Sequence, residues 1–157
     1  MAWVRCDRCG IAKDDVRSRR GTSARRLGGD QERRIERVYG PRKVGEHGDA
    51  IDLLGRDFAW QSKATRQPPA AWLSGVDSAG LRFAAPALVR ESVAAMLPLL
   101  AHRLPLVIVS HVHQGRETRD WIWVRADDWH RLHGGGVREG WLVMSGDWFL
   151  AVNGRDV

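Results

Sequence analysis

Cysteine is scarce in this sequence, and long apolar runs are absent. Its 157 residues include only two cysteines, Cys6 and Cys9, too few for a disulfide framework. Their CxxC spacing is half of a four-ligand zinc site, so zinc binding there is left open. No stretch approaches the roughly 20 apolar residues of a membrane helix, and charges stand near the amino terminus where a signal peptide is apolar. We therefore expect a soluble, cytoplasmic protein without a membrane partner.

Lysine is also scarce, whereas arginine is abundant. Only three of the 25 basic residues are lysines, and with 19 acidic residues the formal net charge is +6. Ten basic residues crowd into residues 17–43. A basic surface attracts polyanions through Coulomb attraction and counterion release, so this run favours a nucleic-acid partner. A charge run of this kind is usually a plain solvated face, which is the alternative interpretation.

Hydrophobic periodicity divides the chain into two parts. Residues 1–29 are arginine-rich, lack periodicity and end in two glycines, which predicts a basic, loosely ordered extension that carries the CxxC pair. Residues 30–157 are expected to form one folded domain. Within it, Asp30 is a candidate cap for a short helix that ends at Gly40. The clearest helical spacing lies in residues 87–103.

Several strand-like runs accompany these helices, and no internal repeat is apparent. We expect a hairpin at residues 50–64 and two central strands at residues 104–113 and 119–126. A glycine-ended helical turn at residues 127–136 and a final hairpin at residues 141–154 should follow. Helices and strands that alternate in this way predict an α/β fold with a mixed central sheet flanked by helices.

The first hairpin carries the residue pattern with the most chemical content. Residues two apart on a strand share a face, so Gln61 and Lys63 point the same way. If the turn centres on residues 55–56, Asp52 lies opposite Ala59, diagonal to Gln61 and on its face, whereas Asp49 takes the other face. Oxygen ligands of this kind hold Mg²⁺, and a lysine nearby can position an attacking water. The plain alternative is the polar face of a half-buried hairpin.

These residues resemble the PD-(D/E)xK nuclease superfamily, particularly the Holliday junction resolvase-like enzymes of archaea and phages. The resemblance covers roughly residues 30–132 and implies a restriction endonuclease-like core. It assigns Glu32 as the acid of an early helix, Asp52 as the metal-binding Asp, and Gln61 with Lys63 as the (Glu/Gln)-x-Lys motif. Metal ligands would then be Asp52, Gln61 and Glu32, with Lys63 assisting the water.

Two positions leave alternatives open. Gln61 stands where Glu is commoner, which removes one negative charge and should weaken metal binding. Glu36 lies one helical turn after Glu32, so either residue could be the helix acid.

The resemblance implies a Mg²⁺- or Mn²⁺-dependent endodeoxyribonuclease that resolves branched DNA during recombination or phage genome processing, with a homodimer as its form. Residues expected to bind DNA phosphates are Arg19, Arg20, Arg25, Arg26, Arg33, Arg42, Lys43 and Arg66. Two alternatives remain: a restriction- or repair-type nuclease on linear DNA, and a catalytically inactive DNA-binding module.

Overall fold

The computed structural model describes residues 13–45, 49–66, 81–82, 84–112, 117–135 and 139–157, with the backbone alone at 13–25 and 81–82. Cys6 and Cys9, and the question of zinc between them, lie outside the described residues. Among the helices of the described chain, none combines the length and apolar character needed to cross a membrane.

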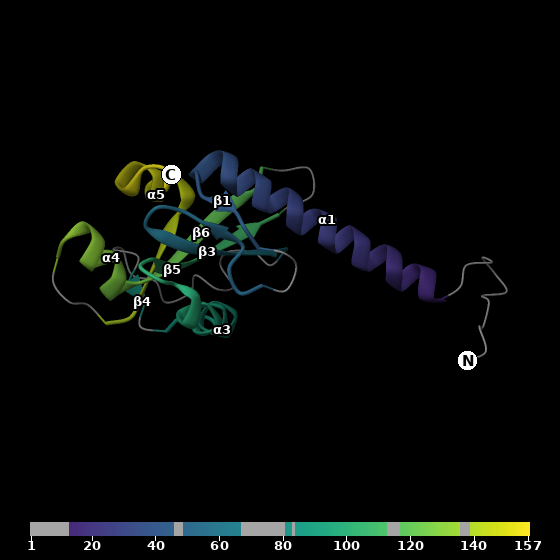
Figure 1. The fold of residues 1–157 in the computed structure, drawn as a ribbon, viewed down its shortest axis with the longest axis horizontal. Helices are drawn as coiled ribbons and strands as arrows, with labels where there is room; N and C mark the ends of the chain where they lie inside the picture. The colour runs from purple at the N-terminus through teal and green to yellow at the C-terminus, as the bar shows by residue number, and fades with distance from the viewer. Residues whose placement is uncertain (1–12, 46–48, 67–80, 83, 113–116, 136–138) are drawn as a thin grey trace.

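A mixed sheet of seven strands forms the centre of the protein (Figure 1). Its spatial order is β1-β2-β3-β5-β6-β7-β4. The two longest neighbours, β3 and β5, run parallel, and every other pair is antiparallel. The strands are β1 (Arg42–Lys43), β2 (Leu53–Leu54), β3 (Phe58–Thr65), β4 (Leu81–Arg82), β5 (Leu104–His111), β6 (Arg119–Arg125) and β7 (Trp141–Ser145). The predicted α/β class with a mixed, helix-flanked sheet is confirmed.

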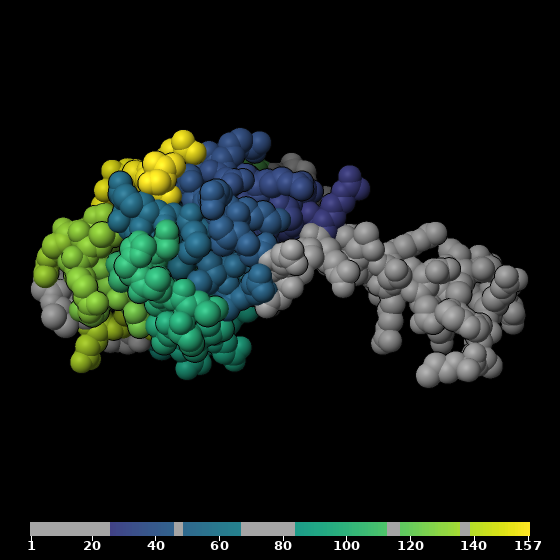
Figure 2. All heavy atoms as spheres, viewed as in Figure 1, coloured from purple at the N-terminus to yellow at the C-terminus, as the bar shows by residue number. Residues whose placement is uncertain are grey.

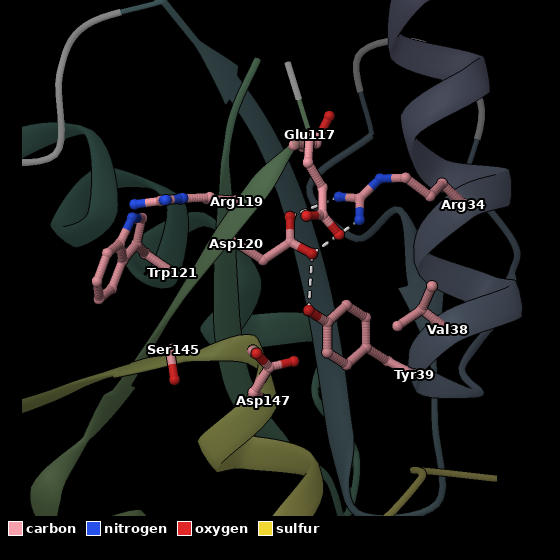
Figure 3. Close-up of a pocket in the computed structure, with 11 residues that line it drawn as sticks. Arg34, Val38, Tyr39, Glu117, Arg119, Asp120, Trp121, Ser145 and Asp147 are labelled. Atoms are coloured by element: carbon pink, nitrogen blue, oxygen red, sulfur yellow. Dashed lines mark hydrogen bonds and ion pairs between the residues drawn. The ribbon is translucent and has the colours of Figure 1, made fainter. Parts of the chain in front are cut away.

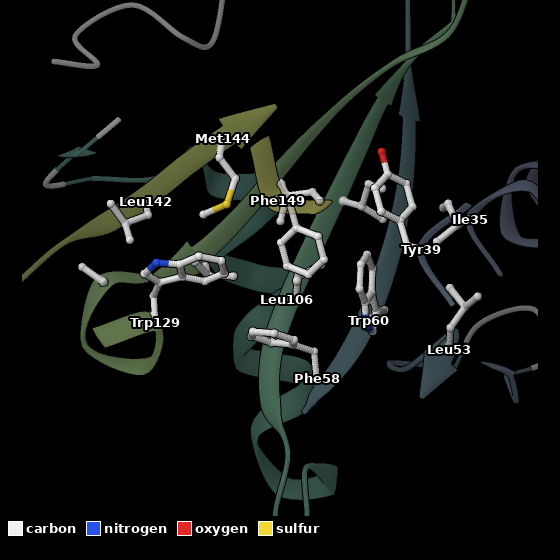
Figure 4. Close-up of a cluster of buried hydrophobic side chains, with 14 residues drawn as sticks. Ile35, Tyr39, Leu53, Phe58, Trp60, Leu106, Trp129, Leu142, Met144 and Phe149 are labelled. Atoms are coloured by element: carbon white, nitrogen blue, oxygen red, sulfur yellow. The ribbon is translucent and has the colours of Figure 1, made fainter. Parts of the chain in front are cut away.

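Helices cover both faces of the sheet and bury two apolar clusters. They are α1 (Lys13–Tyr39), α3 (Ala87–Met96) with the 3₁₀ turn η1 (Leu97–Leu99), α4 (Ala126–His133) and α5 (Gly146–Asn153). On one face, side chains of α1, α4 and α5 pack around Phe149 (Figure 4). On the other face, α3 packs on Val107 and Val109. Alternate residues of β5 therefore serve opposite cores, as the two-residue period of a strand requires.

The first helix begins much earlier than expected. It starts at Lys13 and crosses residues 28–30 without a break, so Asp30 is an internal helix residue and not a cap. Arginine, which is a good helix former, is frequent before the two glycines, and each glycine costs only about 1 kcal/mol relative to alanine. The predicted end at Gly40 is correct, because its φ of 98° is a conformation that glycine adopts freely. The amino-terminal half of α1 extends beyond the sheet (Figure 1).

The final hairpin was predicted wrongly, because β7 is followed by a helix. The Ser145 hydroxyl accepts a hydrogen bond from the Trp148 amide at 3.2 Å, and Asp147 adds an acid to the first turn. Both features favour a helix start over a strand. The apolar run that follows has no clear alternation, so periodicity alone misread it.

A repeated strand–helix unit, missed in the sequence, builds this end of the sheet. β6 with α4 and β7 with α5 match at an offset of 20 residues, with tryptophan at 121 and 141, aspartate at 127 and 147, and glycine at 134 and 154. Both helices end at the matching glycine, with φ of 80° and 72°. The matching residues Trp123 and Val143 are also direct partners across the two strands. The two units are thus related by a local two-fold arrangement.

The buried carboxylate of Asp156 joins the carboxyl-terminal tail to the first hairpin. It is 0% exposed and accepts hydrogen bonds from the Asp57 amide at 2.7 Å, the Phe58 amide at 3.2 Å and the Trp60 indole nitrogen at 2.8 Å. Its own amide donates to the Tyr39 carbonyl at 2.8 Å. The tail, the end of α1 and the hairpin turn are therefore held at one point.

Asp156→Asn should destabilise the fold by about 2–4 kcal/mol, because the amide group would turn a donor towards amides that already donate. The free energy of unfolding from urea titration at neutral pH measures this loss. Arg155→Ala, at an exposed neighbouring position, is the control and should change stability by less than about 0.5 kcal/mol. Equal stability of the two variants would show that the Asp156 hydrogen bonds contribute little.

Candidate active site

Four residues predicted from the sequence line one pocket of about 430 Å³: Glu32, Asp52, Gln61 and Lys63. They come from α1, from the segment before β2, and from β3. Glu32, Asp52 and Gln61 are buried polar residues. The remaining lining is Asp49, Ala50, Ser62 and, from α3, Leu88, Glu91, Ser92 and Ala95. In the space-filling view, α1, the first hairpin and α3 adjoin on one face of the protein (Figure 2).

The hairpin register brings Asp52 directly opposite Gln61. Leu53 pairs with Trp60, and the Gln61 Nε2 donates to Asp52 Oδ2 at 2.7 Å. The expected pairing of Asp52 with Ala59 was wrong by two residues, because the turn is closed by the Gly55 amide on the Phe58 carbonyl. A shift of two keeps every side chain on its face, so the predicted grouping with Gln61 holds.

Asp52 is a carboxylate whose charge the protein compensates only in part. Burial raises its pKa above the ordinary value, and the Glu32 carboxylate raises it further. The hydrogen bond from the Ser62 amide, at 2.8 Å, and the ammonium groups of Lys63 and Lys43 act in the opposite direction, but the net pKa is raised. A cation placed beside Asp52 would relieve this cost.

Glu32 is paired with Lys43, the residue after Arg42 on β1. The Lys43 Nζ lies 2.6 Å from Glu32 Oε2. Lys43 was predicted to bind DNA phosphates, and in the structure its ammonium contacts Glu32, a predicted metal ligand. The alternative helix acid, Glu36, accepts the Lys43 backbone amide at 3.2 Å and is not part of the pocket lining. Of the two acids, only Glu32 reaches the pocket.

The pocket is acidic although the whole chain is basic. Among the residues that the structure describes, four carboxylates line it, those of Glu32, Asp49, Asp52 and Glu91, against one ammonium, that of Lys63. Asp49 was predicted on the opposite face, which was wrong because β2 begins only at Leu53 and strand alternation does not extend back to it. Glu91 was missed because only the packing of α3 on this face of the sheet brings it near.

The oxygen groups that line this pocket are of the chemical type that binds a hard divalent cation. Mg²⁺ is commonly bound by one or two carboxylates, retains several waters and uses substrate phosphates for the rest. Here Glu32 and Asp52 would supply the carboxylates, and Gln61 would supply an amide oxygen. Within the described ranges, no group of three or more His, Cys, Asp or Glu side chains is arranged to hold a metal ion. An ion here would therefore depend on the amide and on water as well as on the acids.

The arginines expected to bind DNA fall into two groups. Arg26, Arg33, Arg42 and Arg66 are exposed, and Arg33 lies 3.4 Å from Asp30 in a solvent-accessible pair. Such a pair contributes little to stability and leaves the guanidinium accessible. For Arg19, Arg20 and Arg25 the structure describes only their place on the amino-terminal half of α1.

A second polar cluster, not foreseen from the sequence, fastens α1 to the sheet beside a cavity of about 510 Å³ (Figure 3). Asp120 accepts hydrogen bonds from Arg34 at 2.8 Å, from the Tyr39 hydroxyl at 2.7 Å and from the Ser110 hydroxyl at 2.7 Å. Burial, together with the charge of Asp120, raises the pKa of Tyr39, so the phenol remains a donor. Arg34 is two residues from Glu32, and this cluster therefore helps to orient the helix that carries the acid.

Asp52→Asn should make the metal-free protein more stable relative to wild type at pH 7 than at pH 3. The raised pKa of folded Asp52 means that its contribution to stability is lost as pH rises from the ordinary carboxyl value of 3.8 through the folded value. The variant lacks this loss. Urea unfolding in EDTA at both pH values measures the difference, and the pH 3 value isolates the other effects of the substitution. A difference that does not change with pH would contradict the electrostatic account.

No protein-family model matches this chain, and neither the curated proteins nor the solved structures contain a significant match. Its function is therefore inferred from the arrangement of its side chains.

Proposed function

We propose that this protein is a divalent-metal-dependent DNA endonuclease with a restriction endonuclease-like core. The observation that carries the proposal is the convergence of Glu32, Asp52, Gln61 and Lys63 in one pocket from three separate segments. The element order supports it: an acid-bearing helix, an antiparallel hairpin with the Asp and the Gln-x-Lys triplet, a helix, and then a parallel strand, β5. These are the elements that the PD-(D/E)xK resemblance implies.

The pocket residues divide the chemistry among them. Asp52, Glu32 and the Gln61 amide oxygen would hold Mg²⁺ or Mn²⁺, which when bound supplies an activated water and offsets charge on the phosphate. Lys63 shares the face of Gln61, because both pair with β5 residues that pack on α3. Its ammonium can orient the attacking water and offset the charge that builds on the phosphate oxygens. Leu88 and other residues of α3 line the pocket on one side.

The charge of the protein supports a nucleic-acid substrate. The net charge is +6, and exposed arginines lie on α1 and directly after β3, two of the segments that build the pocket, and on β1, whose Lys43 contacts Glu32. Arginines placed in this way bind backbone phosphates without reading sequence. A branched junction as substrate, a homodimer as the active form, and a role in recombination or phage genome processing are parts of the proposal that depend on the family resemblance.

Lys63→Ala should reduce cleavage at least about 100-fold while leaving the fold and DNA binding nearly intact, because a single transition-state cation is removed. Labelled four-way junction and linear duplex, incubated with Mg²⁺ or Mn²⁺, measure the rate and separate a junction resolvase from a nuclease of linear DNA. Arg131→Ala, which removes an exposed cation outside the pocket lining, is the control. No cleavage of either substrate by the wild type, or unchanged cleavage by Lys63→Ala, would refute the mechanism.

A second candidate is a catalytically inactive DNA-binding module. It is favoured by Gln61, whose amide replaces a carboxylate and donates a hydrogen bond to Asp52. In a module of this kind the protein would bind DNA equally well in Mg²⁺ and in EDTA, and it would not cleave.

Gln61→Glu should bind Mn²⁺ about tenfold more tightly than wild type, because it adds a carboxylate to the ligand set. It should also be less stable than wild type in EDTA, because two carboxylates would then lie opposite each other. Isothermal titration calorimetry and urea unfolding measure the two effects. Ser62→Ala, at the neighbouring position, is the control for a substitution without charge. A Gln61→Glu variant with unchanged Mn²⁺ affinity would show that residue 61 is not a ligand.

A further inference from the structure

Lys43 is tied to both acids on the last turns of α1. Its ammonium lies 2.6 Å from Glu32 Oε2, and its backbone amide donates to Glu36 Oε1 at 3.2 Å. The Glu32 side chain is 12% exposed, whereas the Lys43 side chain is 34% exposed. The pair therefore has a buried anion and a cation whose stem reaches solvent. A lysine in this setting can leave its partner without crossing the protein interior.

The ammonium of Lys43 is paired with the Glu32 carboxylate, which the proposed function requires as a ligand of the metal ion. Two cations near one carboxylate repel each other, so an arriving divalent ion weakens the hold of Glu32 on Lys43. The released ammonium then needs another anion. The pocket of a DNA nuclease offers one, since a phosphate is present when substrate is bound.

The presence of lysine, and not arginine, at position 43 supports an ion pair with Glu32 that can be broken over one that is permanent. The chain has 22 arginines and three lysines, and two of the three, Lys43 and Lys63, act on Asp52 through their charge. A guanidinium would hold Glu32 through two parallel hydrogen bonds in a planar fork. An ammonium makes single, rotatable contacts on a flexible stem and is more easily exchanged.

We propose that Lys43 is a built-in competitor of the metal ion at Glu32, and that metal binding transfers its ammonium from Glu32 to a DNA phosphate. This inference rests on the proposed function, because it assumes that Glu32 is a metal ligand. It makes Lys43 a positioning residue that couples the two ligands: metal entry creates a phosphate contact that the metal-free protein lacks.

The first test measures Mn²⁺ affinity without DNA by calorimetry, in wild type, Lys43→Gln and Lys43→Arg. Removal of the competitor should tighten Mn²⁺ binding about threefold to tenfold in Lys43→Gln, whereas Lys43→Arg should match or weaken the wild-type affinity. The matched control is Arg131→Gln, which removes a cation paired with Asp127 at 2.6 Å outside the pocket and should change nothing. In a Glu32→Gln background the Lys43→Gln effect should disappear.

The second test measures the salt dependence of DNA affinity with Ca²⁺ and with EDTA. In Ca²⁺, the slope of log affinity against log salt should be steeper for wild type than for Lys43→Gln by about one, which corresponds to one extra phosphate contact. In EDTA the two slopes should agree. Thermal unfolding of each variant verifies that it is folded.

The outcomes separate this inference from the proposed function. If wild type binds Mn²⁺ and cleaves DNA while Lys43→Gln shows unchanged Mn²⁺ affinity and an unchanged Ca²⁺ slope, the inference is overturned and the nuclease stands. If neither protein binds Mn²⁺ and wild type does not cleave, both are overturned. Tighter Mn²⁺ binding by Lys43→Gln, with the loss of the Ca²⁺-dependent contact, supports the transfer.

Discussion

The hydrogen bonds that the Asp156 carboxylate accepts from the first hairpin are the constraint on which the pocket depends. They hold the amides of Asp57 and Phe58, so the turn must lie at residues 55–58. The hairpin turn also requires glycine at position 55, because an added Cβ there would meet the Asp156 carboxylate. Once this turn is fixed, Leu53 pairs with Trp60 and Asp52 faces Gln61. A turn one residue away would send Asp52 to the other face.

A second constraint sets the position of α1, and with it Glu32. The Asp120 cluster fastens Arg34 and Tyr39, while Ile35 is fully buried in the core between them. β1 and β2 have only two residues each, so the sheet is short at this edge. The Glu32 side chain of α1 can therefore reach a pocket that otherwise lies on the side of the sheet covered by α3. The site forms where the two helical layers meet at the sheet edge.

Much of this arrangement could be predicted from the sequence, because strand parity depends only on whether an offset is odd or even. The register was wrong by two residues, yet Asp52, Gln61 and Lys63 remained grouped. Features that depend on distant packing were not predictable: the Lys43–Glu32 pair, the entry of Glu91 from α3, and the Asp120 cluster. The early start of α1 and the helix after β7 were missed for another reason. The glycines at residues 28–29 indicated a break before the helix, and the apolar run after β7 indicated a strand. Packing and helix capping favoured a helix in both places.

The contact between Asp57 and Asp156 joins positions 99 residues apart. Contacts of such separation form late, since the intervening chain must first be ordered at an entropic cost. During synthesis the hairpin leaves the ribosome well before the carboxylate that fixes its turn has been made. The acids of the pocket would consequently come into register only after α5 has docked and delivered Asp156. The pocket of this protein would therefore form only when the rest of the fold is in place.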